Sequence, residues 1–145
     1  MNFVDAVKIC FAKYADFNGR ARPSEYWWFM LFLVIASLII GSVSSLLGNL
    51  FSLATFVPSI AVTARRLHDT NKTGWLQVGW IISSMVGLAL VVIGFASMFM
   101  HSSGAPSMVM GSLGGVLMLA SIAVAIYFMV QPCDAGDNQY GSPSA

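Results

Sequence analysis

The chain has 145 residues, of which 57% are hydrophobic and 9% are charged, and its formal net charge at pH 7 is +1. Typical soluble domains carry about 25% charged residues, so this composition indicates a membrane protein. The near-zero net charge and the lack of a basic run argue against a nucleic-acid partner. The two cysteines, Cys10 and Cys133, have neither metal-site nor redox-motif spacing.

The first predicted element is an amphipathic helix within residues 3–17. Its apolar positions recur at helical spacing, and they are Phe3, Val7, Cys10, Tyr14 and Phe17. The charged residues between them cancel in sign, so apolar burial has to hold this helix at the membrane surface. We expect it to lie along the cytoplasmic interface; packing against a partner protein is the alternative. Mixed charges before the first apolar run argue against a secretory signal.

Two long stretches without any charged residue, 26–64 and 73–133, predict the membrane spans. A helix rises about 1.5 Å per residue and the hydrocarbon core is about 30 Å thick, so one crossing takes about 20 residues. The turn signal Gly48-Asn49 divides the first stretch, and the link 101–106 divides the second. The predicted spans are residues 26–47, 50–65, 74–99 and 108–130. The predicted fold is an all-α integral membrane protein, a single domain over residues 1–145 with four transmembrane helices as two hairpins.

The basic residues predict the orientation of this bundle. All seven Lys and Arg fall either in residues 1–25 or in the loop between the second and third spans. The positive-inside rule places that face in the cytoplasm, and all four Trp lie near the same face. We therefore expect a multi-pass protein with both termini in the cytoplasm, including a tail over residues 131–145.

Two short polar segments on this face, residues 17–27 and 65–75, contain the candidate functional residues. Helix ends explain part of them, because Ser24 and Glu25 suit the start of the first span and arginines suit the end of the second. Asn71 or Thr73 is expected to cap the third span. The candidate cluster is Arg20, Arg22, Glu25, Arg65, Arg66, His68 and Asp69.

Two compatible roles are predicted for this cluster. In the first, Glu25 and Asp69 pair with Arg20, Arg65 or Arg66 and lock the two hairpins together, since partly buried arginine networks are stronger than single exposed pairs. In the second, the surplus arginines hold an anionic lipid headgroup or another anionic ligand, framed by the tryptophans. Besides membrane lipids, a second copy of the chain or a membrane-protein partner remains open.

The alternative is a membrane-embedded enzyme or small-solute transporter that uses His68 and Asp69. Adjacent residues at a helix end point apart, and no second histidine lies on this face to complete a base or a metal site. The predicted spans also contain no carboxylate, which argues against ion-coupled transport. We therefore expect a non-enzymatic protein with no catalytic residue, no metal and no cofactor.

Several motifs resemble a known family. They are Phe17-x-Gly19-Arg20 followed by Glu25-Tyr26-Trp27, the block Arg65-Arg66-Leu67-His68-Asp69-Thr70 with Gly74-Trp75, and a tail with Asn138, Tyr140, Gly141 and Pro143. Together they resemble the small bacterial inner-membrane proteins grouped as domain of unknown function 805. The resemblance covers nearly the whole chain and implies a four-helix protein of the bacterial inner membrane. It implies no particular activity, so the function has to be argued from the residues.

Overall fold

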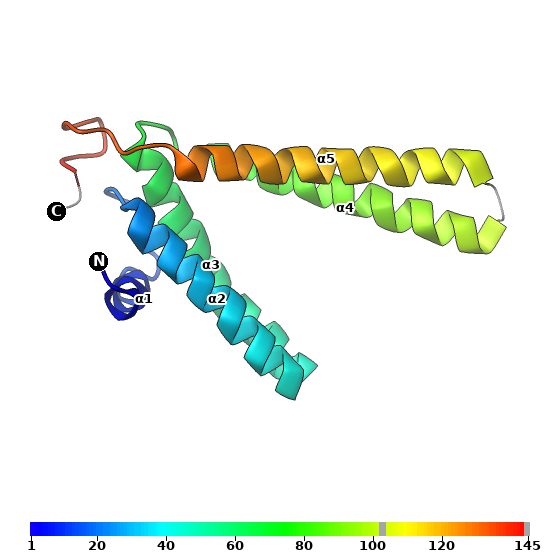
Figure 1. Cartoon of the computed structure of the whole chain (residues 1–145), viewed down its shortest axis with the longest axis horizontal. Coiled ribbons are helices and arrows are strands. Elements are labelled where there is room, and N and C mark those ends of the chain that lie inside the picture. Colours follow the sequence, from blue (N-terminus) through cyan, green and yellow to red (C-terminus); the bar gives the residue numbers. More distant parts are fainter. Residues whose placement is uncertain (102–103, 144–145) are drawn as a thin grey trace. The chain divides into compact units, whose positions relative to one another are not determined.

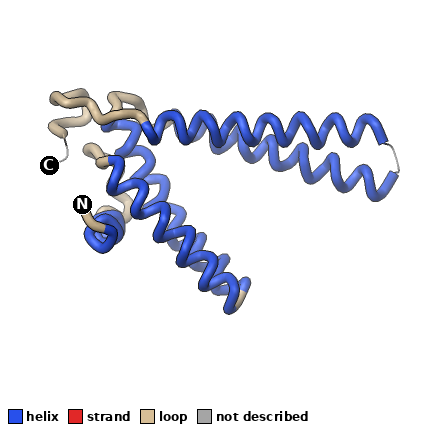
Figure 2. Tube along the Cα trace, in the orientation of Figure 1, coloured by secondary structure: helices blue, strands red, loops and turns tan. Residues whose placement is uncertain are grey.

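The computed structural model describes residues 1–101 and 104–143. The described residues form five α-helices, which are α1 (Phe3–Ala12), α2 (Pro23–Val43), α3 (Ser45–Asp69), α4 (Leu76–His101) and α5 (Gly104–Val130) (Figures 1 and 2). The last four are long and apolar enough to cross a membrane. The prediction of an all-α fold with four spans behind a short amphipathic helix is confirmed. Two compact units make up the chain, one of residues 75–128 and one of residues 1–74 with the segment that begins at Met129.

The turn of the first hairpin lies at Ser44, so the predicted turn at Gly48-Asn49 and the spans 26–47 and 50–65 are wrong in their boundaries. Ser44 adopts an extended conformation (φ −158°, ψ 127°) that separates α2 from α3. Gly48 instead lies inside α3, where a Cβ would be 3.0 Å from the Cα of Gly41 on α2. The glycine therefore permits close helix packing and does not form a turn.

The outer ends of the first hairpin also extend beyond the prediction. α2 begins at Pro23, because proline suits the first helical position, where no N–H is needed. α3 continues to Asp69, four residues beyond the predicted end at residue 65. Its last turn carries polar side chains that find partners inside the protein, so they do not force the helix to end.

The second unit contains the packed part of the α4–α5 hairpin, whose helices lie side by side in Figure 1. A Cβ at Gly87 would be 2.8 Å from the carbonyl oxygen of Gly114, so only glycine allows this approach. α4 is shifted by two residues from the predicted span 74–99, and α5 begins four residues before the predicted span 108–130. Pro106 is in the first turn of α5, where its missing N–H has no cost. Ser102 and Ser103 of the predicted link lie outside the described residues.

α1 is an amphipathic helix that packs on the first hairpin, but it ends at Ala12 and not at residue 17. Its ring contacts join Phe3 to Trp28 and Phe11 to Phe29, at centroid distances of 5.9 and 5.7 Å. Ala6 and Cys10 of α1 are buried. Its charged side chains are exposed, so the apolar face of α1 lies against α2.

Tyr14, just after α1, compensates for a proline inside α3. Pro58 has no N–H to donate to the carbonyl of Ala54, four residues earlier in the helix. The Tyr14 hydroxyl donates a hydrogen bond to that carbonyl oxygen. An unpaired carbonyl in an apolar environment costs several kcal/mol, so this hydrogen bond stabilises α3 at the position of Pro58.

We expect Tyr14→Phe to lower the free energy of unfolding by about 1–3 kcal/mol, because it leaves the Ala54 carbonyl without a donor. The same change in a Pro58→Ala background should have almost no effect, since residue 58 then donates its own N–H. A double-mutant cycle of unfolding in detergent micelles measures both. An equal cost in the two backgrounds would show that Tyr14 stabilises the protein in another way.

Candidate functional site

A buried cluster of charged residues joins the segment before α2, the end of α3 and the C-terminal segment. Arg20 is central to it, and its Nε donates to Asp69 Oδ1 at 2.9 Å with both side chains almost fully buried. Its other donors bind the carbonyl oxygens of Asp69 (3.3 Å), Asp134 (2.5 Å), Gly136 (2.7 Å) and Gly141 (3.3 Å). The C-terminal segment is thus folded around one guanidinium group.

Arg66 approaches the same carboxylate from within α3. Its Nη1 donates to Asp69 Oδ2 at 2.7 Å, so each oxygen of Asp69 accepts from a different guanidinium. Nε and Nη2 of Arg66 donate to the carbonyl of Met129 at 3.3 and 3.2 Å, and Nη2 also donates to that of Gln131. Met129 is in the last turn of α5, where carbonyls have no helical donor and carry the negative end of the helix dipole. Arg66 therefore pairs with Asp69 and also caps α5.

A second ion pair, Glu25 with Arg65, lies under α1. Arg65 Nη1 donates to Glu25 Oε1 at 2.6 Å, and the Cys10 thiol donates to the same oxygen at 3.8 Å. Arg65 is fully buried, and its Nε and Nη2 have no hydrogen-bond partner among the described residues. Of the five charged side chains buried in the described part of the chain, three are therefore arginines and two are carboxylates.

The end of α3 is fixed by its backbone as well as by its side chains. Asn71 has a left-handed conformation (φ 55°), and its N–H donates to the carbonyl of His68 at 3.0 Å. The Lys72 N–H donates to the Leu67 carbonyl at 2.9 Å, which completes a Schellman motif. Asparagine tolerates this conformation better than most residues. Of the two residues expected to cap the next helix, Asn71 instead ends α3.

His68 holds the C-terminal segment against the loop before α2. Its ring stacks on Tyr140, with centroids 3.8 Å apart and planes inclined by 6°. His68 Nδ1 lies 3.2 Å from the Gly19 carbonyl oxygen, which accepts a hydrogen bond from it, and Asn138 donates to the His68 carbonyl at 2.9 Å. Gly19 has φ of 80°, which favours glycine. Sequence reasoning did not include Asn138 and Tyr140 among the site residues, although both belong to the tail motif.

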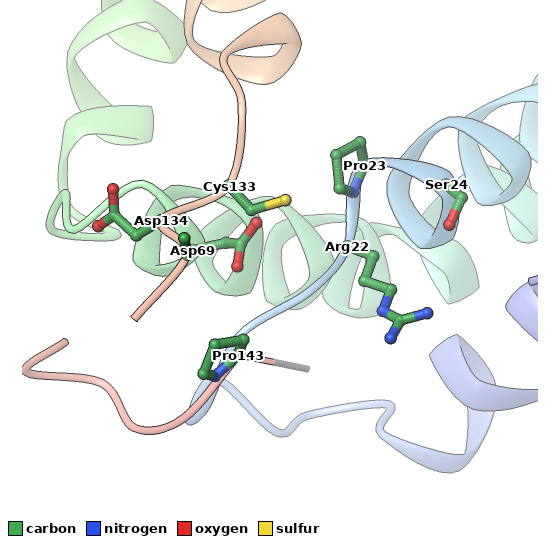
Figure 3. A pocket seen from close by; sticks show the side chains of 8 residues that line it. Arg22, Pro23, Ser24, Asp69, Cys133, Asp134 and Pro143 are labelled. Atoms are coloured by element: carbon green, nitrogen blue, oxygen red, sulfur yellow. The ribbon is translucent and has the colours of Figure 1, made fainter. Parts of the chain in front are cut away.

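A pocket of about 570 Å³ lies beside this cluster (Figure 3). It is lined by Arg22, Pro23, Ser24, Asp69, Cys133, Asp134, Ala135 and Pro143. In Figure 3 the guanidinium of Arg22 points away from the Asp69 carboxylate. Within the described residues, no three His, Cys, Asp or Glu side chains are grouped so that they could share a metal ion.

Comparison with known proteins identifies the family. The family model described as "Protein of unknown function (DUF805)" matches residues 14–142, which include every residue of this cluster except Cys10. The chain belongs to this family. It is 40% identical over 83 residues to the inner membrane protein YhaI of Escherichia coli K12, covering 48% of this chain and 70% of the relative. It is 32% identical over 90 residues to the inner membrane protein YhaH of the same strain, covering 54% and 74%.

These relatives are named as inner membrane proteins, which together with the four spans supports a multi-pass protein of the inner membrane. No solved structure matches this chain.

Cys10 and Cys133 are expected to differ in reactivity. Burial, and secondarily the charge of Glu25, raise the pKa of the Cys10 thiol to about 12, whereas Cys133 is exposed. Because the thiolate is the reactive form, only Cys133 should react with a disulfide reagent near pH 8 in the native protein. Unfolding should release the second thiol. Cys133→Ser is the control and should leave the native protein unreactive; two fast thiols would contradict the burial of Cys10.

Proposed function

We propose that this protein is a non-enzymatic inner-membrane protein whose charged cluster fastens the helix ends and the C-terminal segment at the cytoplasmic face. The observation that carries the proposal is Arg20, whose buried guanidinium binds Asp69 and three carbonyls of the C-terminal segment. The cytoplasmic orientation of this face and of both termini rests on the positive-inside rule applied to all seven basic residues.

The contacts of Asp69 and His68 favour this structural role over an enzyme or transporter that uses them. Each oxygen of Asp69 accepts from a guanidinium, so both oxygens are engaged inside the protein. His68 is stacked on Tyr140 and bonded to the Gly19 carbonyl. Both side chains hold other segments in place, so neither is positioned to exchange a proton with a substrate.

The energetic effect of such a cluster is to select one arrangement of the segments that it joins. A buried ion pair adds little net stability over apolar residues, but removal of one partner leaves a charge uncompensated and costs about 3–5 kcal/mol. The cluster therefore tolerates only arrangements in which the segment before α2, the end of α3 and the C-terminal segment meet. The segment that follows α5 takes part in this arrangement through its carbonyl groups.

The two ion pairs are expected to respond differently to removal of both partners. Glu25→Leu and Arg65→Met should each cost about 3–5 kcal/mol, and the double variant should recover most of this loss because no charge is left behind. Asp69→Leu with Arg66→Met should recover much less, since Arg20 then loses its carboxylate. Unfolding in detergent measures both cycles.

Limited proteolysis tests whether the cluster holds the C-terminal segment. Arg20→Met should expose residues 131–143 to cleavage, whereas the Glu25→Leu/Arg65→Met double variant should keep them protected. A protected tail and unchanged stability in Arg20→Met would contradict the fastening role.

An anionic headgroup site is the second part of the proposal, and the pocket beside the cluster supports it. Arg22 lines this pocket beside Ser24 in the first turn of α2, and it supplies the basic wall of the headgroup site. Helix N-termini and basic pockets on the cytoplasmic side favour phosphate groups. An acidic group of a membrane-protein partner or of a second copy would be held by the same charge.

We expect Arg22→Gln to reduce retained phosphatidylglycerol several-fold in native mass spectrometry of the protein extracted with its lipids. Lys72→Gln is the matched control, because it removes the same charge from the same face but not from the pocket. Equal retention in both variants would exclude a headgroup site at Arg22.

A further inference from the structure

α1 crosses the first hairpin from the level of Glu25, which Cys10 contacts, to that of Phe32. Rings of Phe3 and Phe11 contact Phe32 at 6.4 and 5.9 Å, and Phe32 lies about 14 Å along α2 from its start at about 1.5 Å per residue. Tyr14 binds the carbonyl of Ala54, which is near the middle of α3. These contacts show that α1 extends from the polar end of the hairpin into its apolar part.

The apolar belt of this hairpin is the part of its surface that contacts the hydrocarbon of the bilayer. Three features place one edge of this belt at the level of α1. The charged residues Asp5, Lys8 and Lys13 are exposed, so they have to reach headgroups or water. Trp27 and Trp28 are exposed, Trp28 contacts Phe3 of α1, and tryptophan favours the headgroup zone. On α3, Phe56 is the last exposed large apolar residue, and the described residues from 57 to 70 are buried or half-buried.

The turn at Ser44 sets the other edge. Ser44 makes no side-chain hydrogen bond that would cap α3, and the first N–H groups of α3 and last carbonyls of α2 have no helical partner. Unpaired backbone groups do not occur in hydrocarbon, so this turn has to reach the opposite polar zone. Val43, just before it, and Leu46, two residues after it, are strongly exposed and apolar.

The distance between these two edges is shorter than an ordinary bilayer. At about 1.5 Å per residue, Trp28 to Val43 spans about 22 Å and Ser45 to Phe56 about 17 Å, against a hydrocarbon core of about 30 Å. α4 has 26 residues and spans about 39 Å. The difference between the length of the apolar belt and the thickness of the hydrocarbon core is therefore specific to the first hairpin.

We propose that α1 and the α2–α3 hairpin form a shallow unit that thins the bilayer around it, and that its preferred lipid partner is a bilayer of short acyl chains. The polar groups at both edges have to be hydrated, so the lipid has to adjust to the protein. The free energy needed to thin the bilayer increases as the acyl chains lengthen. The proposal does not depend on the fastening role of the cluster or on a headgroup site at Arg22.

The full-length chain carrying Cys133→Ser and Ser44→Cys tests this in vesicles of dimyristoleoyl, dioleoyl or dierucoyl phosphatidylcholine. The probe is a membrane-impermeant maleimide present on both sides of the vesicles, which removes the effect of insertion orientation. Cys133→Ser alone is the background, because Cys10 is buried and does not react. We expect the labelling rate at position 44 to fall at least tenfold from the shortest to the longest chains.

Two controls make the result specific. Met100→Cys near the end of α4 should label at rates within about twofold in all three lipids, since that helix is long enough for each bilayer. Insertion of one helical turn of leucine into each of α2 and α3 should restore labelling of position 44 in dierucoyl vesicles. Equal labelling of position 44 in all three lipids, or none in any of them, would overturn the proposal.

Discussion

The buried surplus of positive charge is the constraint on which the first unit depends. Arg20, Arg65 and Arg66 are buried with only two carboxylates, and arginine cannot lose its proton inside a protein. The remaining charge is spread over backbone carbonyls, and those of Asp69 and Met129 lie at the C-terminal ends of α3 and α5. Helix C-termini carry partial negative charge, so they can compensate a guanidinium without a further acid. The ends of two helices therefore have to meet at this cluster, and the C-terminal segment has to fold over it.

α1 completes this unit in two ways. It covers the Glu25–Arg65 pair with Cys10, which keeps water from a pair whose arginine has donors without partners. It also brings Tyr14 to the carbonyl that Pro58 leaves without a donor. A surface helix with cancelling charges thus acts as a structural element of the bundle, and its position on α2 and α3 is set by specific contacts as well as by attraction to lipid.

The fold could be predicted from the sequence because charge and length alone define membrane spans. Uncharged stretches have to become helices in lipid, and two crossings fit in each of them. The boundaries of the helices could not be predicted, because a glycine such as Gly48 can form a turn or allow close packing of two helices. Which of the two occurs depends on the position of the neighbouring helix. The polar segments identified the residues of the candidate cluster. The choice of partners could not be read from them, since Asp69 binds two arginines and much of the compensation comes from backbone carbonyls, which every residue has.

The charged cluster and the shallow hairpin are physically connected through α3. This helix has two parts, residues 45–56 with an apolar, exposed surface and residues 57–69 enclosed by protein. Because the helix is continuous, the cluster that fixes Arg66 and Asp69 also fixes how far the exposed part extends. Enclosure lets α3 carry two arginines and an aspartate within one helix, and it removes more than half of the helix from contact with lipid. The short apolar belt is then a consequence of burying the charged residues. Each turn of α3 that is enclosed together with these residues is a turn that cannot cross the hydrocarbon.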